Sequence, residues 1–308
     1  MASRLSRMSG VSHDGRFAPS PTGPLHLGSL RTALVAWLFA RSSSAAFRLR
    51  VEDLDPQRSR REFEQTQMAD LRALGIDWDG EPIRQSERRH VYEAALSELR
   101  AQDRLYPCFC TRAEIREAAS APHGEYPDGA YPGTCRELTV EQRRARERAG
   151  RPFAWRVRAD GEPIGFTDLL AGRHSARVDD FVVRRTDGVP AYQLAVVVDD
   201  AAQRIGEVVR GADLLSSTPR QLLLGRLLGL PQPAFAHVPL VLGADGARLA
   251  KRHGAVTLAE RGEGVDVTLA WLAHSLGLAL DRNRVDTAAE LIDEFDPRWL
   301  PRQPINLK

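Results

Sequence analysis

Lysine is nearly missing from this sequence. Only Lys251 and the terminal Lys308 occur, so that 41 of the 43 basic residues are arginine. Genome composition explains a bias of this kind, and the bias makes the single internal lysine conspicuous. A strong charge imbalance is also absent. The 43 basic and 41 acidic residues give a formal net charge of +2, which neither requires nor excludes a nucleic-acid partner, because a local patch matters more than the total.

The sequence also lacks long apolar runs, and its three cysteines are an odd number. No stretch approaches the roughly 18 uninterrupted apolar residues of a membrane-spanning helix, so we expect no membrane partner. Residues 1–13 contain Arg4 and Arg7, but no apolar signal core follows them, and we expect a disordered leader with Met1 or Met8 as the initiator. Three cysteines cannot all pair. We therefore expect a cytoplasmic, reducing environment, with free thiols or a metal site rather than disulfides.

The first third of the chain alternates between helix and strand patterns. Residues 30–41 have the apolar spacing of a helix, and residues 46–52 alternate apolar and charged side chains as a strand does. Helical patterns follow over 60–74 and from residue 86 onward. This order is typical of an α/β fold in which helices cover a parallel sheet.

The alternation stops at residue 106 and resumes near residue 186. The segment between them holds all three cysteines and predicts short antiparallel strands at 154–157 and 177–183. The apolar run 194–198 predicts a buried parallel strand. Thr218 and Pro219 predict a helix start, with Thr218 as the cap, and the last residues predict helices at 265–275 and 285–295. We predict a leader (1–13), a first catalytic half (14–105), an insertion (106–185), a second catalytic half (186–245) and a loop with a small helical segment (246–308).

A proline- and glycine-rich turn links the first strand to the first helix over residues 18–28. Such a junction lets the backbone approach a ligand and points a helix N-terminus at it, which favours a phosphate group. His26 could donate a hydrogen bond to a phosphate oxygen. A plain tight turn with a surface histidine is an equally weighted alternative, because glycine-rich turns are common.

A second candidate motif is the basic loop over residues 243–254, which contains Lys251 between Gly246 and Gly254. A mobile cationic loop can close over a triphosphate and neutralise the charge that develops during phosphoryl or adenylyl transfer. The alternative is a solvated basic turn. That alternative is weaker here, because a chain so biased towards arginine has a lysine at this place.

Together these motifs resemble the class I aminoacyl-tRNA synthetases. His26, Leu27 and Gly28 are similar to the HIGH signature of that family, the residues before them to its glutamyl/glutaminyl branch, and the basic loop to its KMSKS motif. The matching segments, in the order of the family, are 16–23, 26–28, 52–55, 198–200, 210–219 and 248–252. Two departures stand out, because Arg248 occupies the place of a usual lysine and Ala250 that of a usual serine.

Within the glutamyl branch, the short chain and the Cys-x-Cys insertion resemble the members that lack a large anticodon-binding region. Those enzymes activate L-glutamate with ATP and attach it to the modified base queuosine in the anticodon of tRNA(Asp). The resemblance implies a Rossmann-type parallel sheet split by a zinc-bearing insertion, ATP accompanied by Mg²⁺, and tRNA(Asp) containing queuosine as the partner. We expect a monomer.

The resemblance also implies the roles of individual residues. A dicarboxylate amino acid calls for arginines that bind its carboxylates and for a carboxylate that binds its ammonium group. Matching positions give His26 and Lys251 as catalytic residues, a glutamate site of Arg16, Ala18, Ser20, Glu52, Tyr192 and Arg210, and an ATP site of Pro19, His26, Gly28 and Lys251. For Asp199 and Asp200 two possibilities remain: they contact a ligand, or they only shape the site.

The cysteines are candidates for a zinc site. Cys108, Cys110 and Cys135 supply three thiolates, and tetrahedral zinc needs a fourth ligand. His123 is the better ligand by softness. The resembled enzymes, however, use a tyrosine four residues before the last cysteine, a spacing that Tyr131 meets, so we predict one zinc ion held by Tyr131 with His123 as the alternative. Three unmetallated thiols remain possible.

Two other functions fit parts of the pattern. One is a compact glutamyl-tRNA synthetase that charges the 3′ end of tRNA(Glu). The other is a non-catalytic glutamate- or nucleotide-binding relative, for which the replacements at Arg248 and Ala250 argue.

Overall fold

The computed structural model describes residues 13–119, 130–249 and 256–307. The predicted leader up to residue 12, His123 and the loop residues Ala250 and Lys251 lie outside these ranges. No helix in the described ranges is long and apolar enough to cross a membrane.

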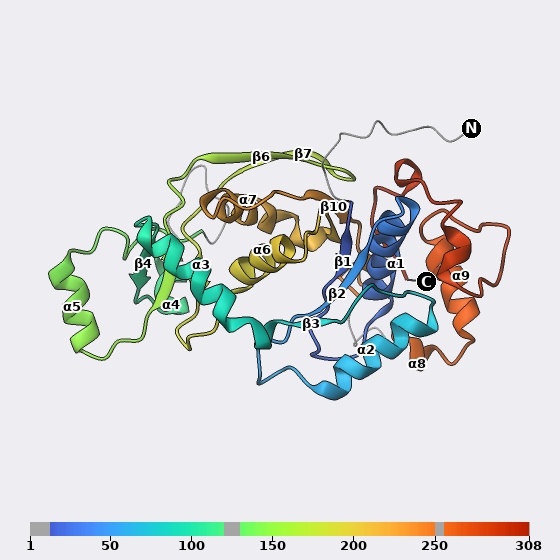
Figure 1. Ribbon diagram of the computed structural model, residues 1–308, viewed down its shortest axis with the longest axis horizontal. Coiled ribbons are helices and arrows are strands. Elements are labelled where there is room, and N and C mark those ends of the chain that lie inside the picture. The colour runs from blue at the N-terminus through green and yellow to red at the C-terminus, as the bar shows by residue number, and fades with distance from the viewer. Residues whose placement is uncertain (1–12, 120–129, 250–255, 308) are drawn as a thin grey trace.

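The first half of the catalytic unit is a parallel sheet in the order β1-β2-β3, with helices between its strands (Figure 1). Its elements are β1 (Gly15–Phe17), α1 (Leu27–Ser42), β2 (Phe47–Val51), α2 (Arg61–Ala73), β3 (Ile83–Arg84), a 3₁₀ turn (Gln85–Arg88) and α3 (Arg89–Ala101). Helix α1 is almost entirely buried and packs against β1 and β9, because its leucines, alanines and aromatic residues cover most of its circumference.

The second half adds strands in the order β7-β6-β10-β9, parallel except for the β6–β7 hairpin. Its elements are β6 (Pro163–Asp168), β7 (Gly172–Arg177), α6 (Tyr192–Ala202), β9 (Glu207–Gly211), a 3₁₀ helix (Ala212–Ser217), α7 (Thr218–Leu227) and β10 (Ala234–Val238). The carbonyl of Asp14 accepts hydrogen bonds from the backbone N–H groups of Gly206 and Glu207. The two halves therefore meet where β1 lies beside β9.

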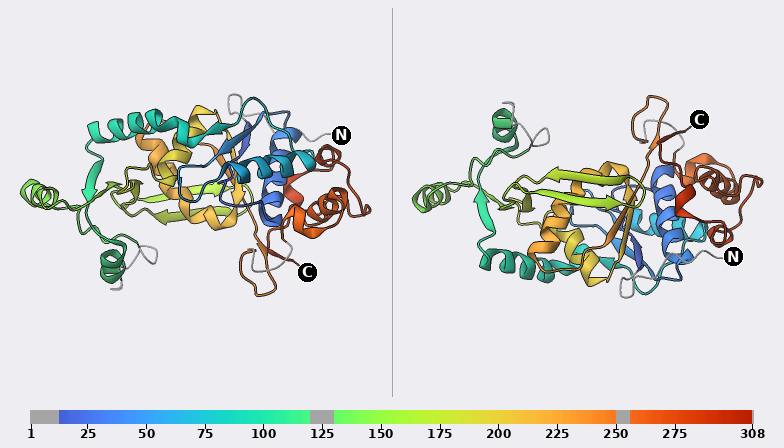
Figure 2. Two further views of the ribbon diagram at one scale, coloured as in Figure 1. Left: turned by 90° about the horizontal axis from the view of Figure 1, so that it is seen from below. Right: turned by 90° about the horizontal axis from the view of Figure 1, so that it is seen from above.

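A smaller unit projects from one end of the molecule, opposite α8 and α9 (Figures 1 and 2). It consists of an antiparallel sheet in the order β4-β5-β8 with two helices. Its elements are β4 (Leu105–Cys108), α4 (Arg112–Ala119), α5 (Val140–Arg148), β5 (Ala154–Val157) and β8 (Val182–Arg184). It has its own small core, which contains Cys108, Tyr131 and Cys135. Within the predicted insertion 106–185, hairpin β6–β7 instead pairs with the catalytic sheet through β10.

The last residues cover the outer face of α1. Their elements are β11 (Val241–Leu242), α8 (Leu258–Arg261), α9 (Val265–His274), the 3₁₀ turns Ala288–Leu291 and Pro297–Trp299, and β12 (Ile305–Asn306), which pairs with β11. Arg31 of α1 is buried and donates to the hydroxyl and carbonyl of Ser275 and to the carbonyl of Pro239, so it ties α1 to the end of α9.

Four local predictions are wrong. Residues 194–198 lie within helix α6 rather than in a strand, and α6 contacts both α3 and α7. The prediction failed because a short apolar run has the same sequence pattern in a buried helix as in a buried strand. The strand predicted at 177–183 is the end of β7 and the start of β8, which belong to different sheets.

The remaining two errors concern helix ends. Thr218 already has helical backbone angles and does not cap α7, because a 3₁₀ helix leads directly into that helix. Over 285–295 only the 3₁₀ turn Ala288–Leu291 forms, with Thr287 and Glu290 as its capping box. The N–H of Ala288 donates to the carbonyl of Leu74, so the segment docks onto the end of α2.

Candidate active site

A cavity of about 890 Å³ opens where the two halves of the sheet meet. Its walls are the end of β1, the turn before α1, the end of β9 and residues 247–249. It is lined by every predicted glutamate- and ATP-site residue within the described ranges: Arg16, Ala18, Pro19, Ser20, His26, Gly28, Glu52, Tyr192 and Arg210. Crevices at the carboxyl ends of parallel strands are where open α/β sheets bind nucleotides.

The turn before α1 is held by side-chain and backbone hydrogen bonds. Gln67 of α2 is buried, and its side-chain amide donates to the carbonyls of Ser20 at 3.1 Å and Gly23 at 2.7 Å. The N–H of Glu52 donates to the carbonyl of Pro19 at 3.0 Å. These hydrogen bonds fix the turn to the end of β2 and to α2.

His26 caps the first turn of α1. Its backbone is extended, and its Nδ1 accepts a hydrogen bond from the N–H of Ser29 at 3.1 Å. In the neutral ring the proton therefore sits on Nε2, which lies 3.3 Å from Ser29 Oγ and can donate to a ligand in the cavity. Burial and the nearby cation of Arg248 lower the pKa of His26, which keeps the ring neutral. A Cβ at Gly28 would lie 3.2 Å from this ring, so the packing favours glycine there.

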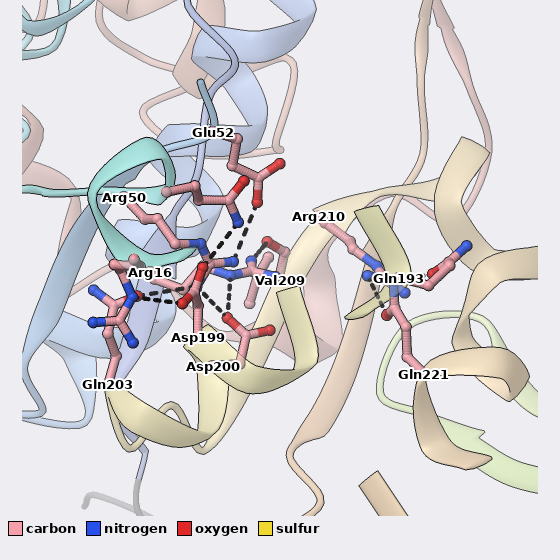
Figure 3. Close-up of polar contacts among 12 residues, drawn as sticks. Arg16, Arg50, Glu52, Gln193, Asp199, Asp200, Gln203, Val209, Arg210 and Gln221 are labelled. Carbon is pink, nitrogen blue, oxygen red and sulfur yellow. Dashed lines mark hydrogen bonds and ion pairs between the residues drawn. The ribbon is translucent and has the colours of Figure 1, made fainter. Parts of the chain in front are cut away.

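Four charged residues form a network of ion pairs at the cavity wall: Arg16, Arg50, Glu52 and Asp200 (Figure 3). Asp200 accepts from Arg16 Nε at 3.2 Å and from Arg50 Nη1 at 2.6 Å, and Arg50 Nη2 lies 3.3 Å from Glu52. Arg50 is fully buried, whereas Arg16 and Glu52 line the cavity. Burial raises the pKa of Glu52, and the cations of Arg50 and Arg16 act against that rise.

Neither aspartate of α6 lines the cavity. Asp199 is fully buried and accepts hydrogen bonds from Gln85, Arg88 and Tyr92, which join α6 to the start of α3. Asp200 holds Arg16 and Arg50. Of the two possibilities left open by the sequence, the contacts favour a role in shaping the site.

Arg210 differs from Arg16 and Arg50 in its partners. It is 5% exposed and lines the cavity, but no carboxylate in the described ranges lies within 4.0 Å of its guanidinium nitrogens. It donates instead to His237, Gln221 and Thr218. Burial lowers the pKa of Arg210. A buried cation without a counter-ion is costly, and an anionic ligand in the cavity would offset that cost.

The three cysteines come together in the small unit, which projects from one end of the molecule (Figure 1). Their Sγ atoms lie within 4.8 Å of one another. The hydroxyl of Tyr131 lies 3.3 Å from Cys108 Sγ and 3.8 Å from Cys110 Sγ, and the N–H of Cys135 donates to it at 2.8 Å. A hydrogen bond with Cys135 is the main cause that lowers the pKa of Cys108, which favours its thiolate.

Sequence reasoning missed four residues that support the cavity: Gln67, Arg50, Asp168 and His237. For Arg50 a signal existed, because Arg50 and Glu52 lie two residues apart and so share one face of the predicted strand 46–52. The other three have no local signal, since their partners lie in distant segments.

Comparison with known proteins identifies the family. Residues 14–276 match the model of the catalytic domain of class I tRNA synthetases (E and Q). The chain is 58% identical to the glutamyl-Q tRNA(Asp) synthetase of Nocardia farcinica, over 94% of this chain and 91% of that protein, and 52% identical to that of Symbiobacterium thermophilum, over 95% of each. A glutamate tRNA ligase from Elizabethkingia meningosepticum, crystallised with its amino acid, superposes with a TM-score of 0.81 at 29% identity, over 96% of this chain and 67% of that one. The chain belongs to the class I tRNA synthetases of the glutamate and glutamine branch.

Proposed function

We propose that this chain activates L-glutamate with ATP and transfers the glutamyl group to the queuosine base in the anticodon of tRNA(Asp). The observation that carries the amino-acid part is Arg210, a buried cation that lines the cavity and whose hydrogen-bond partners in the described ranges are all neutral. The names and nearly complete overlap of the two bacterial relatives support the acceptor.

Charges at the cavity complement those of glutamate. Arg16 and Arg210 bind the two carboxylates, and Glu52 binds the ammonium group. Arg50 and Asp200 hold Glu52 and Arg16 in place. Because the pairs are buried, the electrostatic attraction is stronger than it would be in water. Tyr192, with its ring at the cavity wall, and Ala18 and Ser20 of the turn complete the site.

The first chemical step is adenylate formation. A carboxylate oxygen of glutamate attacks the α-phosphorus of ATP, the bond from this phosphorus to the bridging oxygen breaks, and pyrophosphate leaves. No side-chain nucleophile takes part, so the protein contributes positioning and electrostatic stabilisation. His26 donates from Nε2 to a phosphate oxygen, and Pro19 and Gly28 let the nucleotide approach the backbone. Mg²⁺ accompanies ATP and is held mainly by phosphate oxygens.

Lys251 supplies a positive charge in this step. The residues that flank its loop lie beside the site, because Leu249 lines the cavity and the N–H of Leu27 donates to the carbonyl of Val256. Arg248, at the start of the loop, also lines the cavity and lies close to Asp213. A cation added from this side neutralises the charge on departing pyrophosphate.

The second step is transfer to RNA. A hydroxyl of the cyclopentene diol of queuosine attacks the activated carbonyl carbon, loses its proton, and AMP leaves as the carbon–oxygen bond to phosphate breaks. An anticodon loop presents unstacked bases that can enter a cavity of this kind.

Zinc belongs to the small unit rather than to the reaction. We propose that Cys108, Cys110, Cys135 and Tyr131 hold one Zn²⁺, because three clustered thiols and a phenol oxygen in contact with them form a four-ligand set. Bound zinc would fix the fold of the unit, since structural metal binding is coupled to folding.

Glutamate-dependent exchange between ATP and pyrophosphate tests the activation step. We expect exchange with glutamate without any tRNA, and much weaker exchange with glutamine or aspartate. A purified chain that shows no exchange would support the non-catalytic relative. Equal exchange with glutamine would contradict the assignment of Arg16 and Arg210 to carboxylates.

A further inference from the structure

A buried histidine–aspartate pair stands behind Arg210. His237 lies on β10 and Asp168 at the end of β6, and both side chains are 0% exposed. His237 Nδ1 lies 2.5 Å from Asp168 Oδ2, and Arg210 Nε lies 3.0 Å from His237 Nε2. Neither His237 nor Asp168 lines the cavity, but His237 Nε2 contacts Arg210, which does, and it also lies 3.3 Å from Thr218 Oγ1.

The contacts define the tautomer of His237. A guanidinium group can only donate, so His237 Nε2 must accept the hydrogen bond from Arg210 Nε–H. The ring proton is therefore on Nδ1, where it is donated to Asp168. Burial lowers the pKa of His237, and Arg210 and His174 lower it further. Asp168 acts in the opposite direction but does not outweigh them, so the ring stays neutral.

Asp168 is itself held by the backbone. Its Oδ1 accepts three N–H groups, from Leu170 at 2.9 Å, Ala171 at 2.8 Å and His237 at 3.1 Å. Burial opposes its charge, but the hydrogen bonds from His237 and these amides outweigh it and lower the pKa of Asp168. The carboxylate is thus ionised and fixed in rotation, with Oδ2 left for the imidazole.

We propose that Asp168 and His237 are positioning residues, which orient Arg210 for a substrate carboxylate through a neutral imidazole. This proposal rests on the proposed role of Arg210 in binding glutamate. The hydrogen bonds from Arg210 through His237 to Asp168, here called the relay, give Arg210 an indirect counter-ion. The guanidinium keeps its charge, and no carboxylate in the described part of the chain pairs with it directly in place of the substrate. Gln221 at 2.7 Å and Thr218 at 2.9 Å hold the other end of the group.

The replacement Asp168→Asn tests the relay with almost no change of shape. Because three backbone N–H groups surround Oδ1, the amide oxygen of asparagine would stay there and its NH₂ would face His237. The imidazole would then have to accept on Nδ1 and carry its proton on Nε2, where it meets the N–H of Arg210. We expect the KM for glutamate in pyrophosphate exchange to rise at least tenfold, with the KM for ATP within twofold of the wild type.

Two further variants separate positioning from general stability. Asp180→Asn is the matched control: Asp180 is also buried and accepts from one backbone N–H, Arg136 and Tyr106, but it lies in the small unit. Its glutamate KM should not change. In a His237→Gln background, glutamine can accept from Arg210 without a fixed tautomer. Adding Asp168→Asn there should change the glutamate KM less than twofold, whereas a purely structural effect would be additive.

The tautomer can also be measured directly, from the ¹⁵N chemical shifts of the His237 ring in the wild-type chain. We expect protonated Nδ1 and unprotonated Nε2. Protonated Nε2 would overturn the relay, even if Asp168→Asn failed to fold. So would a folded Asp168→Asn variant with an unchanged glutamate KM. The two failures are distinguishable, because absent glutamate-dependent exchange in the wild type contradicts the proposed function, whereas normal exchange with these results contradicts the relay alone.

Discussion

The replacement Arg50→Met probes the charged network at the cavity wall. Arg50 is fully buried and contacts Asp200 at 2.6 Å and Glu52 at 3.3 Å. In the wild type the cations of Arg16 and Arg50 balance the two carboxylates. Methionine has a similar length and no charge, so the variant leaves buried Asp200 and partly buried Glu52 with Arg16 as the one remaining cation of the four-residue network.

The expected loss of stability follows from that imbalance. Removing one partner of a buried ion pair costs about 3–5 kcal/mol. For a chain of 308 residues, an unfolding entropy of about 2.1 cal/mol/K per residue amounts to about 0.65 kcal/mol/K. The melting temperature should therefore fall by about 5–8 °C.

The same change should alter binding through Glu52. Burial raises the pKa of Glu52, and Arg50 is the largest influence that lowers it. Without Arg50 this pKa rises further. Only ionised Glu52 attracts the ammonium group, so the chain binds glutamate well only above the pKa of Glu52. As the pH is lowered, Arg50→Met should therefore lose its affinity for glutamate at a higher pH than the wild type does. The stability defect of the variant has the opposite pH dependence. In the variant, Glu52 binds a proton more readily in the folded than in the unfolded chain, so lowering the pH removes part of the defect. The difference in melting temperature between Arg50→Met and the wild type should therefore become smaller at lower pH.

Thermal unfolding and the pH profile of the glutamate KM in pyrophosphate exchange measure both effects. Arg31→Met is the matched control, because Arg31 is about equally buried and its hydrogen-bond partners among the described residues are Ser275 and the carbonyl of Pro239, none of them a carboxylate. It should leave no unpaired carboxylate and no shift in the pH profile. An Arg50→Met variant with an unchanged melting temperature and an unchanged profile would refute the reasoning.

Three further predictions concern separate parts of the molecule. Arg210→Lys keeps a charge but loses the planar fork. It should raise the glutamate KM at least tenfold, while the equally buried control Arg31→Lys does not, and equal KM values in the two variants would count against Arg210 as a ligand. Lys251→Ala should lower the exchange rate at saturating substrate with little change in the glutamate KM, because the charge acts as pyrophosphate departs. An exchange rate within a few fold of the wild type would exclude Lys251 as that cation. Metal analysis should find about one zinc per chain, and Cys135→Ser should release it and loosen the small unit before the main sheet; wild-type protein purified without chelators and free of zinc would exclude the site.

The sequence predicts the first half of the fold well because local signals are strong there. The alternation around Phe47 and Leu49 and the apolar helix after Gly28 depend on periodicity alone, and the structure has both elements where they were predicted. Helix α6 was missed, because its apolar face is nearly continuous and a buried helix of this length has no distinctive period.

The cavity residues show the same division. Motif positions such as Arg16, His26 and Glu52 could be taken from a resemblance, and the structure brings them to one cavity. The residues that support them could not be found in this way. Arg50 and Asp200 are 150 residues apart, and Asp168 and His237 are 69 residues apart, so only the folded chain reveals these pairs.

The position of the transferred glutamate tests the central claim most directly. Purified chain, ATP and labelled glutamate are incubated with tRNA(Asp) that contains queuosine, and with the same tRNA carrying unmodified guanine. The label is then located by nuclease digestion. We predict label on the queuosine nucleoside only, none on the unmodified tRNA, and protection of the queuosine diol from periodate after the reaction. Label released as glutamyl-adenosine from the 3′ end would contradict the account and identify the chain as a compact synthetase that charges the 3′ end.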